Sequence, residues 1–103
     1  MNVAIGNCMT PALLDTGSSV TLCNSQLLPK LKECTYRLPK RNLDLRSANG
    51  DLLKIQDLRR GTVVLNDRKT PTDIVFINNL QVPCILGMDY LQAAGIVIDA
   101  GAK

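Results

Sequence analysis

The stretch that decides the fold is ALLDTGSS at residues 12–19, where three apolar residues lead directly into an Asp-Thr-Gly turn at 15–17. Near the other end, CILGMDYL at residues 84–91 places two aliphatic residues and a glycine before a segment of good helix formers. Aspartate and glycine are favoured turn residues, so the first stretch predicts a strand that ends in a tight turn. The second stretch predicts an apolar strand at 85–87 against which that turn packs.

Length and composition indicate one domain over residues 1–103. A chain of 103 residues is large enough for one hydrophobic core. Hydrophobic residues make up 46% of it, but Tyr36, Phe76 and Tyr90 are the only aromatics, so the core must be aliphatic, which favours β structure. So few aromatics do not suit a stacking platform for nucleic acid, and a solvated face explains the net charge of +3. We therefore expect no nucleic-acid partner.

Several other classes of site are excluded or disfavoured. Histidine is absent, which excludes histidine-based metal sites, Cys–His dyads and Ser–His–Asp triads. The cysteines Cys8, Cys23, Cys34 and Cys84 lack Cys-x-x-Cys spacing, which favours small apolar residues in a reducing intracellular compartment over a zinc or disulfide framework. We expect no metal and no other cofactor. No segment has the length of a membrane span and no leader precedes the fold, so we expect no membrane partner.

Alternating apolar and polar residues predict an all-β fold. Residues 3–14 indicate a hairpin around a Gly-Asn turn, in which Pro11 restricts the second strand to an edge or a bulge because proline lacks an N–H. Residues 88–94 predict one short C-terminal helix that ends at Gly95. Further strands are expected at 20–23, 62–65, 73–77, 84–86 and 96–98.

Two segments between the strands carry other signals. Pro29 is expected to end any helical turn that precedes it, and residues 30–41 are expected to be the least structured part of the chain. Asn49 and Gly50 between alternating apolar residues form the strongest short-range hairpin signal, because both accept positive φ angles. They predict a hairpin over about residues 43–57.

The single Asp-Thr-Gly suggests a catalytic site that two identical chains form together. Two close carboxylates that share one proton can hydrolyse a peptide bond: the ionised one takes a proton from water, and the neutral one hydrogen-bonds the carbonyl. Like charges so close cannot both ionise, which separates their pKa values, as aspartic proteases illustrate. Asp15 would be the carboxylate that each chain supplies.

The neighbours of Asp15 suit this role. Thr16 can hydrogen-bond across a two-fold axis, Gly17 permits the tight turn, and Ser18 can donate to the outer oxygen of Asp15, which would favour the ionised form and activity in acid. A purely structural turn is the alternative, since Asp-Thr-Gly is a common turn tripeptide. The combination with the hairpin and the aliphatic-aliphatic-Gly segment favours the catalytic interpretation.

With these motifs in place, the chain resembles the retropepsins, the homodimeric aspartic proteases of retroviruses and LTR retrotransposons, over residues 3–100. It looks most like the proteases of gypsy-type retroelements. The resemblance implies an acid-protease half barrel, active as a homodimer, with a flap at about 43–57. It further implies an extended polypeptide substrate from a Gag-Pol-type polyprotein, cut between hydrophobic residues in the cytoplasm or a virus-like particle.

The resemblance also implies roles for individual residues. The catalytic group would be Asp15, with Thr16, Gly17 and Ser18 around it. Asn49 would lie at the flap tip with Gly50, where backbone groups pair with the substrate. Plain core packing is the alternative for Leu13, Leu22 and Ile85. The residues implied to line side-chain pockets are Leu13, Val20, Leu22, Val82 and Ile85.

The chain departs from lentiviral retropepsins at several positions. Ser19 and Val20 stand where those enzymes have two aspartates, and Met88 stands where they have an arginine. The ion-pair network of those residues is therefore absent. The loop at 28–43 is also longer.

Two rival functions remain open. A host-domesticated retropepsin-like domain, as in DNA-damage-inducible ubiquitin-shuttle proteins or the skin aspartic protease, would share the chemistry. Such families often have Asp-Ser-Gly, which counts against them. A dimeric peptide-binding module without turnover is the second rival, against which the intact Asp-Thr-Gly-Ser argues.

We expect weak dimerisation. Retroviral members carry an N-terminal arm that interleaves with the C-terminal strand at the base of the dimer, whereas this chain begins almost at the first hairpin. The strand at 96–98 would then make that interface alone or with different partners. Sedimentation across a micromolar concentration range should show dissociation, and a tight dimer at the lowest concentration would contradict this expectation.

Overall fold

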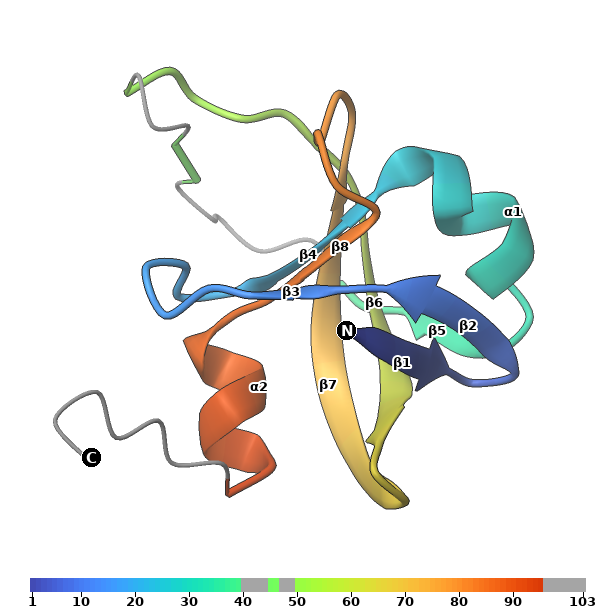
Figure 1. The fold of residues 1–103 in the computed structure, drawn as a ribbon. Helices are drawn as coiled ribbons and strands as arrows, with labels where there is room; N and C mark the ends of the chain where they lie inside the picture. Colours follow the sequence, from blue (N-terminus) through green and yellow to red (C-terminus); the bar gives the residue numbers. More distant parts are fainter. Residues whose placement is uncertain (40–44, 47–49, 96–103) are drawn as a thin grey trace, which may run out of the picture.

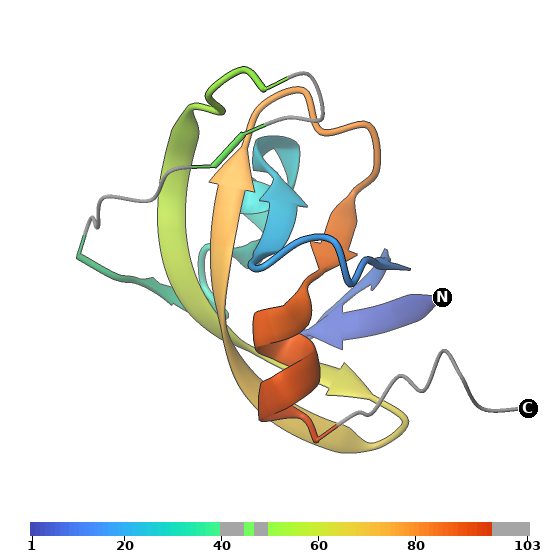
Figure 2. The same ribbon diagram turned by 90° about the vertical axis from the view of Figure 1, so that its left-hand side faces the viewer.

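The computed structural model describes residues 1–39, 45–46 and 50–95, and most of the regular structure in it is strand. The sheet order is β2-β1-β6-β7-β4-β8-β3, with β5 paired to β6 outside this path. Figures 1 and 2 show the sheet curling into an incomplete barrel, with α2 packed beside β7. The all-β fold with a short C-terminal helix is confirmed, while the strand expected at 96–98 lies outside the described residues. The elements are β1 (Asn2–Ile5), β2 (Cys8–Pro11), β3 (Leu13–Leu14), β4 (Thr21–Asn24), η1 (Ser25–Leu27), α1 (Leu28–Leu31), β5 (Thr35–Arg37), β6 (Ile55–Leu65), β7 (Arg68–Ile77), β8 (Cys84–Leu86) and α2 (Met88–Ala93).

The first hairpin forms as the sequence predicts. β1 and β2 pair antiparallel around a turn in which Gly6 has a φ of +60°. A Cβ at Gly6 would also lie 2.4 Å from the Cβ of Cys34, so both the turn and the packing favour glycine. Pro11 lies on β2, at one end of the sheet order, and pairs with Asn2 on β1. The missing N–H of Pro11 therefore costs no bond between two central strands.

The strands of the β6–β7 hairpin are longer than the two short strands, at 62–65 and 73–77, that the alternation predicts. Asn66 and Asp67 turn it with φ angles of 51° and 64°, the left-handed conformation that two-residue hairpin loops require. Arg59, Thr70 and Thr72 interrupt the apolar pattern of these strands, yet all three are buried. Both strands therefore extend beyond the runs of apolar residues in the sequence, because hydrogen-bonded polar residues occupy some of the inward-facing positions.

The expectations for the segment after β4 are wrong in two respects. Pro29 lies in the first turn of α1 instead of ending a helix, because the N–H that proline lacks has no partner in a first helical turn. Within the segment 30–41, expected to be the least structured, β5 pairs antiparallel with β6. No helix in the described ranges is long and apolar enough to cross a membrane.

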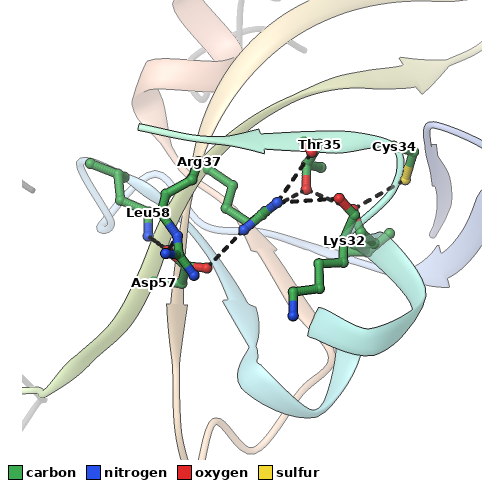
Figure 3. Close-up of polar contacts among 8 residues, drawn as sticks. Lys32, Cys34, Thr35, Arg37, Asp57 and Leu58 are labelled. Carbon is green, nitrogen blue, oxygen red and sulfur yellow. Dashed lines mark hydrogen bonds and ion pairs between the residues drawn. The ribbon is translucent and has the colours of Figure 1, made fainter. Parts of the chain in front are cut away.

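A buried arginine of β6, Arg59, fixes this segment to the sheet. Figure 3 labels four residues of this network: Lys32, Thr35, Arg37 and Asp57. Arg59 is 7% exposed; its Nε donates to Thr35 Oγ1 at 2.8 Å, and one terminal nitrogen donates to the carbonyl oxygens of Lys32 and Thr35 at 3.2 and 3.3 Å. Its other terminal nitrogen pairs with Asp57 at 3.0 Å, and Asp57 also meets Arg37 Nε at 3.4 Å. The planar guanidinium thus satisfies side chains and backbone together, which a lysine could not do.

Two hydrophobic clusters fill the interior, and both are largely aliphatic, as the composition predicts. The main core lies under α2 and the β1–β2 hairpin. The flap-side cluster lies on the opposite face of β4, β7 and β8, where its members alternate with those of the main core, and it includes residues from the segment at 43–57. The main core contains Val3, Ile5, Ala12, Cys23, Leu31, Val63, Ile74, Phe76, Cys84, Leu86, Tyr90, Leu91 and Ala94. The flap-side cluster contains Leu22, Leu58, Val75 and Ile77, with Val20, Leu38, Leu45, Leu53, Ile55, Leu80 and Ile85 packed against it.

The described parts of the hairpin at 43–57 pair with each other. Arg46 and Leu52 form an antiparallel bridge, and the N–H of Leu53 donates to the carbonyl of Leu45 at 2.8 Å. The two arms expected from the Asn-Gly signal are therefore present. Asn49, expected at the tip, lies outside the described residues.

We predict that Arg59→Ala lowers the free energy of unfolding by about 2–4 kcal/mol, because Asp57 and Thr35 would each lose a partner inside the fold. Arg60→Ala is the matched control. Arg60 lies on β6 like Arg59 and pairs with Asp73 at 2.8 Å, but the Arg60 side chain is 40% exposed. Its loss should cost less than about 1 kcal/mol. Urea denaturation at one fixed chain concentration measures both values, and equal costs would contradict a structural role for Arg59.

Candidate functional site

The turn that carries Asp15 is attached to β8. Its strand β3 runs parallel to β8, and the N–H of Asp15 donates to the carbonyl of Leu86 at 3.1 Å. Within the turn, Gly17 N–H donates to Asp15 Oδ1 at 2.9 Å and Ser18 N–H donates to the Asp15 carbonyl at 3.1 Å. The carboxylate is half-buried. One oxygen is therefore held by the turn itself, as expected of a carboxylate that is fixed in direction.

Gly87 brings the start of α2 against the backbone that follows Asp15. A Cβ at Gly87 would lie 2.2 Å from the carbonyl oxygen of Val20 and 2.8 Å from that of Ser18, so no larger residue fits. The next two N–H groups, of Met88 and Asp89, donate to the carbonyls of Ser18 and Ser19 at 2.8 and 3.2 Å. These are first-turn N–H groups of α2, which lack partners inside the helix. The helix start thus holds the Asp15 turn through backbone contacts.

A buried side-chain network reinforces this junction, and the sequence analysis missed it. Thr21 Oγ1 donates to Asp89 Oδ1 at 2.8 Å and accepts from Gly87 N–H at 3.2 Å, and its side chain is fully buried. The same Asp89 oxygen accepts from the N–H of Tyr90 at 2.6 Å. An acidic residue in the first turn of a helix, here Asp89, is the signal that could have revealed it, since carboxylates favour that position.

The side chain of Ser18 differs from its expected role. Its hydroxyl donates to the carbonyl of Val20 at 2.7 Å instead of to Asp15. A hydroxyl has one hydrogen to donate, so in this conformation Ser18 stabilises the turn and leaves the Asp15 carboxylate to Gly17. The expectation of activity in acid, which rested on the Ser18–Asp15 bond, loses its support. Thr16 is exposed, and its bond across a two-fold axis stays a prediction.

Three of the expected pocket residues lie side by side. Ile85 on β8 pairs with Leu13 on one neighbouring strand and with Leu22 on the other. Leu13 is 52% exposed, whereas Leu22 is 8% exposed and belongs to the flap-side cluster. Val20 and Val82 are half-buried. Leu22 is therefore mainly a core residue, while Leu13 has side-chain surface free for another molecule.

The other expected site residues, Asn49 and Gly50, and the cavity over β5 and β6 contribute no described contact to the Asp15 turn. Gly50 is exposed with a φ of +86°, as a hairpin glycine should be, and Asn49 lies outside the described residues. A cavity of about 360 Å³ lies over β5 and β6, away from the Asp15 turn, between Cys34, Tyr36 and Arg60. Within residues 1–39, 45–46 and 50–95, no three His, Cys, Asp or Glu side chains gather as a metal site would require.

We predict that Thr21→Val destabilises the fold by about 1–3 kcal/mol, because Gly87 N–H would lose its partner and Asp89 one of its donors. Thr21→Ser retains the hydroxyl and should cost less. Chemical denaturation gives the free energies, and hydrogen exchange should show faster exchange at Met88 and Asp89 in the valine variant alone. Identical behaviour of the two variants would contradict a role for the hydroxyl.

Comparison with known proteins agrees with this geometry. The family described as retroviral aspartyl protease matches residues 1–99. Among solved structures, EIAV protease complexed with the inhibitor HBY-793 is similar, with a TM-score of 0.76 and 24% identity over 96% of this chain and 89% of that chain. The retroviral protease-like domain of Ddi1 from Leishmania major is also similar, with a TM-score of 0.65 and 16% identity over 96% and 78% of the respective chains. Both likenesses concern the fold, and no curated protein sequence matched. Because the family match spans nearly the whole sequence, this chain belongs to the retroviral aspartyl protease family.

Proposed function

We propose that the chain is an aspartic endopeptidase that works as a homodimer, with one Asp15 from each chain. The observation that carries the proposal is the anchoring of the Asp15 turn. Its main chain is bonded to Leu86 and Met88, while the carboxylate is half-buried and makes its bond within the turn. Among the described strands, β3 ends the sheet order, and we propose that a second copy packs at this edge. Asp89 is unsuited as the second acid because Thr21 and the Tyr90 N–H already occupy it.

In the proposed dimer the two Asp15 carboxylates share one proton. The ionised member removes a proton from the attacking water, and the neutral member hydrogen-bonds the substrate carbonyl, where negative charge develops. Thr16 bonds across the two-fold axis and holds both turns in register. A Cβ at Gly17 would lie 3.1 Å from Asp15 Oδ1, so glycine leaves this side of the carboxylate open.

The substrate is proposed to be an extended polypeptide. Leu13 and Ile85 offer apolar surface beside Asp15, and the hairpin arms at 45–46 and 50–53 would pair with the substrate backbone. Val20 and Val82 extend the same aliphatic lining. Such pockets favour cleavage between hydrophobic residues.

The family supports a role in processing a retroviral or retrotransposon polyprotein, and this is the biological context that we propose. The second candidate is a host-domesticated domain, which the fold likeness to the protease-like domain of Ddi1 favours. Asp-Thr-Gly at residues 15–17, where domesticated families often have Asp-Ser-Gly, favours the first. All four cysteines are free thiols, which suits a reducing intracellular compartment such as the cytoplasm or a virus-like particle.

We predict that Asp15→Asn lowers peptide cleavage by roughly 10²–10⁴-fold, since the amide can neither accept nor share the proton. Cleavage of a peptide library, measured from acid to neutral pH at several chain concentrations, is the assay. The rate per chain should rise with concentration, and a statine-type transition-state mimic should inhibit it.

Asp67→Asn is the matched control for this substitution. Asp67 is exposed in the β6–β7 turn with a φ of 64°, a conformation that asparagine tolerates. It should leave activity unchanged. Full cleavage by the Asp15→Asn variant would overturn the proposed mechanism. Binding of peptide without cleavage in the parent chain would favour a silent peptide-binding module.

A further inference from the structure

Two cysteines face each other on neighbouring strands near the β3 end of the sheet. Cys23 on β4 and Cys84 on β8 are antiparallel partners, and the N–H of Asn24 donates to the carbonyl of Pro83 at 2.9 Å. This bond joins the residue after Cys23 to the residue before Cys84, the pattern that flanks a non-hydrogen-bonded pair. In such a pair the Cα atoms lie about 4.5 Å apart. That spacing lies within the range of about 4.4–6.8 Å that a disulfide bridges.

The two sulfurs are already in contact. The thiol of Cys23 donates to Cys84 Sγ at 3.4 Å, and both side chains are fully buried in the main core. A disulfide is about 2.05 Å long, so the sulfurs need to approach each other by a little over 1 Å. The strands already provide the register for this bond.

The surroundings explain why the pair is reduced. The pKa of Cys23 is raised well above its ordinary value, chiefly by its hydrogen bond to Cys84, then by burial and by the charges of Cys84 and Cys8. A thiol with a raised pKa holds little thiolate at neutral pH and reacts slowly. Cys8 is half-buried, packs against the same core and acts on Cys23 through its charge, so a partly exposed thiol lies near the pair.

We propose that Cys23 and Cys84 form an oxidisable dithiol, which a small peroxide converts to a cross-strand disulfide. One thiolate attacks hydrogen peroxide, the O–O bond breaks, and a sulfenic acid and one water result. The second thiol then displaces the sulfenic oxygen, which leaves as a second water as the S–S bond forms. Two thiols lose two electrons, and peroxide is reduced to two waters.

The disulfide would act on the proposed catalytic site through β8. Leu86, two residues after Cys84, supplies the carbonyl that holds Asp15 N–H, and Ile85 lies between them. The Cα atoms of most disulfides are about 5.5–6 Å apart, so the bond would widen the spacing of β8 and β4 by about 1 Å and would move that carbonyl and the pocket residue together. This consequence rests on the proposed function, whereas the disulfide itself does not. We expect kcat to fall about tenfold on oxidation, since displacements of about 1 Å at a site have effects of that size or larger.

The test is a hydrogen peroxide titration of the full chain, followed by alkylation under denaturing conditions and peptide mapping by mass spectrometry. A mass loss of about 2 Da and a peptide that links Cys23 to Cys84 are expected, reversed by dithiothreitol. The double variant Cys8→Ala/Cys34→Ala retains only the proposed pair and should still form the link. Cys23→Ala should leave Cys84 open to alkylation.

The outcomes separate the parts of this proposal. A link between other cysteines, or over-oxidation of Cys23 and Cys84 without a link, overturns it, and the map of the parent chain decides this even if a variant fails to fold. A link with unchanged kcat overturns the coupling to the catalytic turn. A link in a chain that cleaves no peptide supports the dithiol and contradicts the proposed function instead.

Discussion

The structure depends on the close backbone contact between Gly87 and the chain that follows Asp15. At this point the end of β8 and the start of α2 approach the carbonyls of Ser18 and Val20 so closely that any side chain would collide. The contact lets N–H groups of α2 bond to the turn, and it positions Thr21 to join the two segments. The proposed proton transfer requires the Asp15 carboxylate to be held in one direction, and backbone anchoring of the turn on both sides suits this requirement.

The two hydrophobic clusters of the interior support different parts of the molecule. The main core joins α2, the β1–β2 hairpin and the buried aromatic residues. It supports the Asp15 turn through Leu14, which packs against it. The flap-side cluster joins Leu22 and Leu58 to half-buried residues of the hairpin arms and to Ile85. The residues packed against its four buried members are only partly covered in a single chain. Partner or substrate contacts can therefore complete this cluster without disturbing the main core.

Features set by local backbone geometry could be predicted from the sequence. The Asp15 turn and the helix end at Gly95 follow from residues with strong conformational preferences. Features set by tertiary partners could not. From its local sequence, Pro29 is expected to end a helix, Arg59 to be a surface charge and Asp89 to be an ordinary acidic residue of a first helical turn. Their structural roles differ because their partners are distant in sequence. The side chain of Ser18 was misjudged for a different reason, since both Asp15 and Val20 are close in sequence and local preference does not choose between these two acceptors.

The central claim is that one functional site requires an Asp15 from each of two chains. The most direct measurement mixes the parent chain with its Asp15→Asn variant at constant total concentration, under conditions where dimers form and exchange. If each dimer needs both carboxylates, activity follows the square of the parent fraction, so an equal mixture retains about one quarter of the activity. A linear dependence, with half of the activity retained, would show that each chain works alone and would contradict the account.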